Sequence, residues 1–176
     1  AGSSYASFFI PAKLRSVTIT GGTIGKGAFS GCNALTSITL PSNITSIGAY
    51  ALWGCTGLTG IQLPSTLTSI GEYAFYNCSG LTSVSFPETL TSIGSHAFEN
   101  CTGLKSITIP DQVTELGSGA FENCTSLTSV TLPASVTYIG PRAFLGCTAL
   151  TSLTFKGTTT EWGAVSKNGS WNKNVP

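Results

Sequence analysis

The stretch IGEYAFYNCSGLTSVSFPETLTS at residues 70–92 returns almost unchanged as IGSHAFENCTGLKSITIPDQVTE at residues 93–115. The same 23-residue step recurs along most of the 176-residue chain and keeps several residue types in register. The clearest columns are the cysteines Cys32, Cys55, Cys78, Cys101, Cys124 and Cys147, and the aromatic residues Phe29, Phe75, Phe98, Phe121 and Phe144. Self-similarity at such a period indicates a repeat array. Because one repeat cannot bury its apolar side alone, we expect the coils to stack into a solenoid with a continuous core.

Each repeat reads as a short strand followed by turns. The alternation of Ile38 and Leu40 with hydroxyl residues predicts a half-buried strand. Pro41 should end that strand, because proline has no amide donor for a sheet. Gly48 is expected to mark a tight bend, and the apolar spacing in residues 49–55 favours a short helical or 3₁₀ turn. The predicted fold is therefore mainly β with short helical turns.

The repeat pattern, L-T-S-I-T-L-P-x-x-[IVL]-T-S-I-G-x-x-A-F-x-x-C, resembles the Treponema pallidum-type leucine-rich repeat of BspA-like surface proteins over residues 14–155. That resemblance implies a right-handed leucine-rich-repeat solenoid of about six coils, displayed at bacterial or protist cell surfaces. It also implies a role in adhesion or protein binding. Three departures are visible: Leu52 replaces a phenylalanine, Gly60 replaces a serine, and the first coil is two residues short.

The chain divides into three segments. Residues 1–13 read as an N-terminal lead-in or partial coil, and residues 14–155 as the solenoid. Residues 156–176 lack the repeat and should form a C-terminal cap, which ends as if in the middle of a strand. Thr158–Thr160 offer N-caps for a helix in this segment, with Glu161 in its first turn. Trp162 and Trp171 are expected to cover the last apolar layer, since repeat arrays need atypical ends.

Charge is scarce in this chain. Only 9% of residues are charged and the net charge is +1, which argues against nucleic acid as a partner because phosphate binding requires clustered cations. No apolar run is long enough to span a bilayer, so we expect no direct membrane insertion. No signal peptide is visible at the start of the sequence. An extracellular or cell-surface location follows from the family resemblance alone.

The six cysteines allow two arrangements. Neighbouring strands in a stack lie about 4.8 Å apart, within the Cα separation that a disulfide tolerates. Free cysteine, however, is among the most buried residue types, and each cysteine follows the inward alanine and phenylalanine of its coil. We expect a ladder of buried, reduced thiols rather than bridges. One cysteine per coil does not surround a metal ion, so no metal site is expected.

Catalytic groups are few, and we expect no enzyme activity and no cofactor. His96 is the only histidine and should face solvent, with Asp111 in a loop away from it. Glu99 and Glu122 are one repeat apart, so the stack would bring them to roughly the carboxylate spacing of a retaining glycosidase. Their column also holds serine, tyrosine, tryptophan and leucine. A solvated pair is the favoured interpretation.

Aromatic residues in variable positions provide the first candidate binding surface. Tyr50, Tyr73 and His96 share one column, and Trp53 and Tyr76 share another three residues further on. Stacked coils should bring these rings together on the exposed side of the turns. Such a patch suits a protein or glycan partner on a host or neighbouring cell, or weak self-association.

The strand face, which is concave in leucine-rich repeats, is the second candidate. It should present stacked polar side chains but no aromatic anchor, and binding hot spots are enriched in aromatic residues. Its candidate residues are Thr36, Ser37, Thr39, Gln62, Ser83, Ser85, Lys105, Thr108 and Thr131. The alternative functions are a structural spacer within a larger surface protein and, more remotely, an ice-binding solenoid with a hydroxyl ladder.

Overall fold

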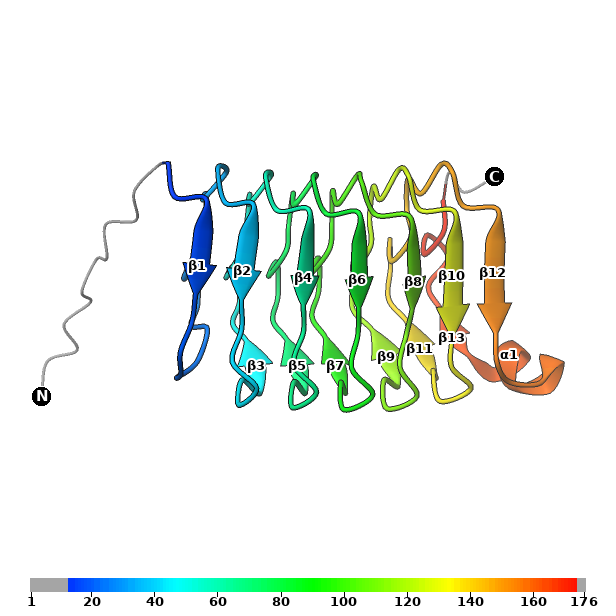
Figure 1. The fold of residues 1–176 in the computed structure, drawn as a ribbon. Helices are drawn as coiled ribbons and strands as arrows, with labels where there is room; N and C mark the ends of the chain where they lie inside the picture. Colours follow the sequence, from blue (N-terminus) through cyan, green and yellow to red (C-terminus); the bar gives the residue numbers. More distant parts are fainter. Residues whose placement is uncertain (1–12, 174–176) are drawn as a thin grey trace, which may run out of the picture.

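Each repeat folds into one coil of a parallel β-solenoid, and successive coils stack side by side (Figure 1). The structure is a computed structural model and describes residues 13–173. All of its strand pairs are parallel, because the chain returns in the same direction after every coil. The predicted solenoid of mainly β structure is confirmed, while the lead-in at residues 1–13 lies almost wholly outside the described residues.

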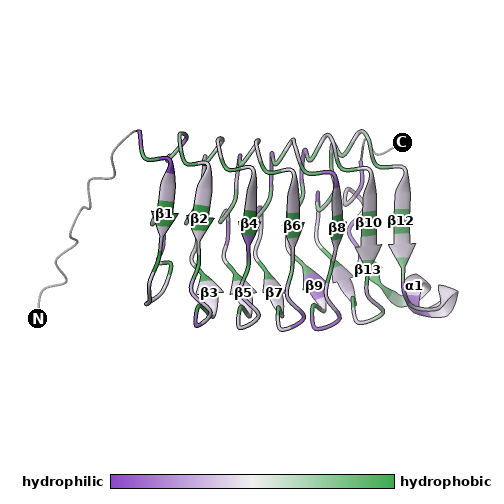
Figure 2. Cartoon of the chain, viewed as in Figure 1, coloured by the Kyte–Doolittle hydropathy of each residue, from purple (hydrophilic) through white to green (hydrophobic). Residues whose placement is uncertain are grey.

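One row of strands forms the strand face. It contains β1 (Ser16–Thr18), β2 (Ser37–Thr39), β4 (Gly60–Gln62), β6 (Ser83–Ser85), β8 (Ser106–Thr108), β10 (Ser129–Leu132) and β12 (Ser152–Phe155). In β2, β6 and β8 the middle residue is buried and its neighbours are exposed, and Figure 2 shows that residue as a green band across each arrow. Val17 pairs with Ile38, which confirms that the first coil is two residues shorter than the others.

A second row of strands runs along the opposite edge of the coils. It contains β3 (Ser46–Ile47), β5 (Ser69–Ile70), β7 (Ser92–Ile93), β9 (Glu115–Leu116), β11 (Tyr138–Ile139) and β13 (Ser166–Lys167). The sequence pattern had predicted only a turn here, and that prediction is wrong. The strands from β3 to β11 in this row bury their second side chain. The backbone groups of the row bond to the neighbouring coil, which satisfies donors that a free turn would leave unpaired.

Glycine recurs at the position of Gly48 in every coil, and the structure gives a different reason for it from the one predicted. Neither Gly48 nor Gly94 has a positive φ, so neither needs the special backbone freedom of glycine. A Cβ placed on Gly94 would instead lie 2.6 Å from the amide nitrogen of Glu72 and 2.7 Å from the carbonyl carbon of Gly71. The predicted turn does begin at Gly48, because the Ala51 amide donates to the Gly48 carbonyl. Glycine is needed there because it allows the backbones of adjacent coils to touch.

The segment after each glycine is a series of turns. The Ala51 amide donates to the Gly48 carbonyl at 3.2 Å, and the next amide, that of Leu52, donates to Ala74 in the following coil at 2.8 Å. Amides of this segment thus alternate between a bond within the coil and a bond to the next coil. The i→i−3 hydrogen bonds expected of a 3₁₀ turn are present. Because every second amide donates to the next coil instead, no continuous helix forms here.

The core consists of columns that stack on themselves. The rings of Phe75, Phe98, Phe121 and Phe144 are fully buried and follow one another at centroid distances of 4.9, 5.4 and 5.6 Å. Leu52 continues this column toward the N-terminus. Phe98 and Phe121 therefore each pack between two other phenylalanine rings, and burial of these rings depends on the stacking of the coils.

The cysteines form a second buried column. All six are free thiols, five are fully buried, and Cys32 in the first full coil is partly exposed. Each buried thiol donates a hydrogen bond to a carbonyl of the preceding coil; for example, the Cys78 Sγ lies 3.1 Å from the Leu52 oxygen and the Cys101 Sγ 3.1 Å from the Phe75 oxygen. The ladder of buried thiols agrees with the prediction from the sequence.

The C-terminal segment closes the last coil. Helix α1 (Thr159–Ala164) begins at Thr158, whose hydroxyl accepts the Glu161 amide while the Glu161 carboxylate accepts the Thr158 amide. The start of this helix agrees with the prediction from Thr158–Thr160 and Glu161. Trp171 then lies edge-on to Phe144 at 6.2 Å and also contacts Trp162. Trp171 therefore lies against the last ring of the phenylalanine column, at the end of the solenoid where the sequence predicts a cap.

Replacing Trp171 by Ala should lower the free energy of unfolding by about 2 kcal/mol, because the ring is half-buried against the last phenylalanine of the core. Chemical denaturation measures this loss. Trp53→Ala is the matched control, since it removes the same ring from an exposed position and should cost less than half as much. Equal losses in the two variants would show that Trp171 is not a cap.

Candidate partner-binding surface

The five aromatic residues singled out in the sequence form one continuous cluster, here called the aromatic ladder: Tyr50, Trp53, Tyr73, Tyr76 and His96. Tyr73 stacks between Tyr50 at 5.1 Å and His96 at 4.8 Å, with ring planes within 12° and 7°. Trp53 stacks on Tyr76 at 5.8 Å and 4°. Tyr73 and Tyr76 join the two stacks at 5.7 Å. The structure thus brings together all five residues.

An unusual backbone conformation holds three of these rings. Tyr50, Tyr73 and His96 have φ values of 58°, 54° and 56°, in the left-handed region. Two other coils place Gly27 and Gly119 in this slot, also at positive φ. A bulky residue pays about 1–2 kcal/mol for this conformation. The left-handed conformation could have been predicted from the sequence, since a column that holds glycine in some coils and large residues in others indicates such a position.

A second left-handed slot behaves differently. It holds glycine or asparagine, including Asn77, Asn100 and Asn123 at 56°, 60° and 57°. Asparagine tolerates this conformation, so its presence follows from the turn alone. The aromatic slot has no such explanation. Stacking offsets part of its strain, at about 0.5–1.5 kcal/mol for each ring pair.

The ladder offers ring edges and polar tips to a partner. Trp53 is 38% exposed, the highest value for a large apolar side chain among residues 13–173, and the three tyrosines are half-buried. Ring faces inside the stack are covered by their neighbours, and Lys26 lies 5.7 Å over the outer face of Tyr50. None of the hydrogen bonds within the described part of the chain uses the three tyrosine hydroxyls. These hydroxyls remain available to a partner.

An ionisable cluster lies at the end of the ladder. The His96 Nδ1 is 2.7 Å from the Glu99 carboxylate, and their side chains are 21% and 16% exposed. Glu122 is buried, with 7% exposure. Burial and the neighbouring Glu99 raise the pKa of Glu122, while Arg142 and His96 oppose that rise. The predictions of a solvent-facing histidine and a solvated glutamate pair are wrong, because the turns direct both carboxylates against the ring of His96.

Asp111 does not approach His96. Its carboxylate instead pairs with Lys156 at 3.1 Å, so these residues give no support to a catalytic triad. That pair is exposed on both sides and contributes little to stability.

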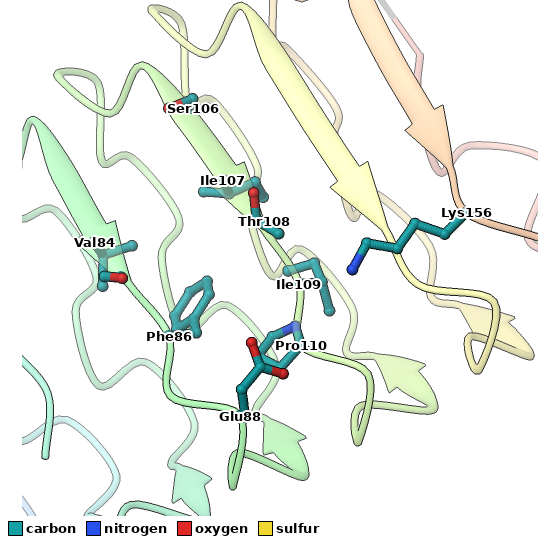
Figure 3. Close-up of a pocket in the computed structure, with 10 residues that line it drawn as sticks. Val84, Phe86, Glu88, Ser106, Ile107, Thr108, Ile109, Pro110 and Lys156 are labelled. Atoms are coloured by element: carbon teal, nitrogen blue, oxygen red, sulfur yellow. The ribbon is translucent and has the colours of Figure 1, made fainter. Parts of the chain in front are cut away.

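The strand face is hollowed in two places. A hollow of about 230 Å³ contains Ser85 and Thr108 from the predicted set, together with Phe86, Glu88 and Lys156. Figure 3 shows Lys156 extending from the end of β12 toward this hollow, with Glu88 beside Pro110. The hollow therefore has a mainly polar surface over buried apolar side chains, with one negative and one positive side chain among its lining residues.

The second hollow measures about 370 Å³ and is nearer the N-terminus. It brings together four residues of the predicted set: Ser37, Gln62, Ser83 and Ser85. The other predicted residues of this face, Thr36, Thr39, Lys105 and Thr131, line neither hollow. Thr36 donates its hydroxyl to the Arg15 carbonyl at 2.9 Å, which ties it to the preceding coil.

Comparison with known proteins gives a consistent family assignment. A family model described as "BspA type Leucine rich repeat region (6 copies)" matches residues 4–125 and 68–166. A leucine-rich repeat protein of T. pallidum has a similar solved structure, with a TM-score of 0.81 and 34% identity over 93% of this chain and 79% of that one. No curated protein matches the sequence.

Two further solved structures come from other bacteria. A leucine-rich cell surface protein of Faecalibacterium prausnitzii has a TM-score of 0.55 and 26% identity over 89% of this chain. A leucine-rich repeat protein of Bacteroides ovatus has a TM-score of 0.69 and 30% identity over 81% of this chain. The present chain covers 63% and 43% of these two proteins. Among the residues described, no helix is both long and apolar enough to cross a membrane.

Proposed function

The chain belongs to the family of BspA-type leucine-rich repeat proteins, and on that premise we propose that it is a cell-surface binding or adhesion module whose partner contacts the aromatic ladder. The observation that supports this proposal is that three consecutive coils hold a bulky ring in a left-handed backbone position, where two other coils have glycine and one has Arg142. Strained positions of this kind gather at functional sites. Stacking explains why the rings are tolerated, but it leaves the exposed Trp53 without a structural role.

The partner is a protein rather than a glycan. Sugars bind aromatic residues through the flat face of a ring, and in the ladder those faces are mostly paired with one another. What remains are apolar ring edges with phenol and indole groups, a combination that is enriched at protein–protein interfaces. With a net charge of +1, long-range electrostatic attraction contributes little, so short-range contacts carry the affinity.

Replacing Trp53 and Tyr76 together by Ser should weaken binding by about 30-fold or more, because hot-spot aromatics contribute about 2 kcal/mol or more. Binding is measured on purified protein against panels of host matrix proteins, cell-surface proteins and glycans. Loss of the stacked pair should lower the free energy of unfolding by only about 1 kcal/mol, so the variant remains folded.

The control places bulk on the strand face. Thr108→Trp with Thr131→Trp obstructs the neighbouring strands β8 and β10, whose side chains stand in register, and should leave binding unchanged. The opposite result, with binding lost in this variant and kept in the serine variant, would move the site to the strand face. Binding to glycans alone would contradict a protein partner. A parent chain that binds nothing would favour the spacer function.

The strand-face hollow with Phe86, Glu88 and Lys156 is the second candidate site. Its mainly polar surface, with one side chain of each charge among the lining residues, would suit an extended peptide. It ranks second because the hydroxyl groups around it are already hydrated, so exchanging water for a partner gains little.

A further inference from the structure

Three potential metal ligands converge where the ladder ends. One ligand atom from each of His96, Glu99 and Glu122 lies within 4.8 Å of the other two. His96 and Glu99 are three residues apart in one coil, and Glu122 comes from the next coil. An imidazole nitrogen and two carboxylate oxygens therefore meet from two separate backbone segments.

The Glu122 carboxylate is buried at this point with one oxygen that accepts no hydrogen bond. The residue is 7% exposed, and its Oε2 is the one buried side-chain oxygen or nitrogen among residues 13–173 that has no hydrogen-bond partner. Leaving a buried carboxylate oxygen without a partner is costly. The other two members do not satisfy it, because the His96 Nδ1 is directed to Glu99.

The space around the cluster depends on a glycine. A Cβ on Gly119 would collide with the His96 ring and would lie 3.1 Å from the Glu122 Oε2. Gly119 is the glycine of the left-handed slot in that coil, at φ 59°. A larger residue there, of the kind that fills the slot in neighbouring coils, would push the imidazole away from Glu122. The coil thus keeps room for the three groups to approach one another.

We infer that His96, Glu99 and Glu122 form a binding site for a divalent transition-metal ion, with zinc as the best match. Zinc binds imidazole nitrogen and carboxylate oxygen, whereas magnesium and calcium select sites made of oxygen alone. Two carboxylates supply the negative charge that such an ion needs, and Arg142 opposes them as the neighbouring cation. With three protein ligands, the ion keeps a coordination position open for water or for a group from a partner.

Such an ion would connect two coils at the edge of the aromatic ladder. His96 stacks on Tyr73, so the imidazole is shared by both features. Zinc binding by these three residues can be measured without a partner. A failure of the proposed partner binding would therefore leave the metal site untouched, and the reverse also holds.

The experiment is zinc titration of the untagged, folded protein, followed by NMR of the imidazole. His96 is the only histidine in the sequence, so its ring signals are assigned without ambiguity. One equivalent of zinc should bind and shift those signals. Folded-state measurements are needed because unfolding would expose six thiols, which bind zinc themselves.

Two variants should abolish the site while keeping the fold. His96→Tyr installs the residue that occupies the same left-handed slot at Tyr50 and Tyr73, and Glu122→Gln keeps the size of the side chain. Each should weaken zinc binding by about 100-fold or more, since even the loss of supporting groups around a metal costs 10–100-fold. Glu72→Gln, at an exposed carboxylate nearby, should bind zinc like the parent.

Arg142→Gly should tighten zinc binding, because it removes the opposing cation while leaving a residue suited to the left-handed slot. The inference is overturned if the parent binds no zinc at millimolar concentration. It is also overturned if zinc binds but leaves the His96 signals unmoved, or binds His96→Tyr as tightly as the parent, because the ion would then sit elsewhere.

Discussion

Alkaline solution is expected to unfold this protein at about pH 10–11, because the fold keeps its thiols protonated. Burial raises the pKa of Cys55 and of Cys147 from 9.0 to about 12. It also raises the pKa of Cys78, Cys101 and Cys124 well above the usual value. In the unfolded chain these groups ionise near their ordinary pKa of 9.0.

The sign follows from the proton balance. Below the unfolded pKa both states hold their thiol protons, so the full stability is present. Above it the unfolded chain releases protons that the folded chain retains, and stability falls until the pH reaches the raised pKa, about 12 for Cys55 and Cys147. Each thiol costs about 1.4 kcal/mol per pH unit. Since five are fully buried, the combined slope is about 7 kcal/mol per pH unit, comparable to the whole stability of a typical domain.

Equilibrium denaturation from pH 7 to 11 under reducing conditions measures this slope. Cys101→Ala is the matched variant, because it removes one thiol from the centre of the ladder. Its stability at neutral pH should drop from the lost packing, but its slope above pH 9 should be shallower by about 1.4 kcal/mol per pH unit. A stability that stays constant between these pH values would mean that the thiols ionise as readily in the folded chain as in the unfolded one, contrary to their burial in the structure.

Replacing Gly94 by Ala should destabilise the protein by about 3 kcal/mol or more, the upper range for overpacking. The new methyl group would meet only backbone atoms of Gly71 and Glu72, between 2.6 and 3.0 Å away. Backbone atoms of a neighbouring coil cannot rotate aside as a side chain does. The two coils would have to separate, which loosens the phenylalanine and cysteine columns together.

Gly60→Ala is the control for this experiment. A Cβ on Gly60 meets no atom within 4 Å, and other coils carry serine in its column. We expect it to be neutral or to stabilise by about 0.4–1 kcal/mol through a less flexible unfolded chain. Thermal or urea unfolding compares the two variants. If Gly94→Ala matched Gly60→Ala, the column would not control the spacing of the coils.

The sequence was sufficient for the features that repeat in every coil. The columns of Phe98 and Cys101 predicted a stacked core, and the threonine run at 158–160 with Glu161 predicted the start of the C-terminal helix. Such features depend on periodicity and on local capping chemistry, which the order of residues expresses directly. The proximity of Tyr50, Tyr73 and His96 followed from the same 23-residue step.

Features that depend on how coils touch were missed. The second row of strands, from β3 to β13, is too short to show an alternation, and it exists because neighbouring coils satisfy its backbone groups. Gly48 looked like a bend because close backbone contact leaves no mark in a single repeat. Glu122 looked exposed because its column tolerates many residue types, and its burial depends on Gly119 and on the His96 ring.

Radical footprinting of the free and partner-bound protein shows whether a partner covers the aromatic ladder, because it labels accessible tryptophan and tyrosine rings. A partner found in the binding screen should reduce labelling at Trp53 and Tyr76. Labelling at Tyr138, which is half-buried on β11 in the second row of strands, should stay the same and serves as the internal reference. Unchanged labelling at Trp53 and Tyr76 in a saturated complex would show that the partner binds elsewhere and would overturn the proposed binding surface.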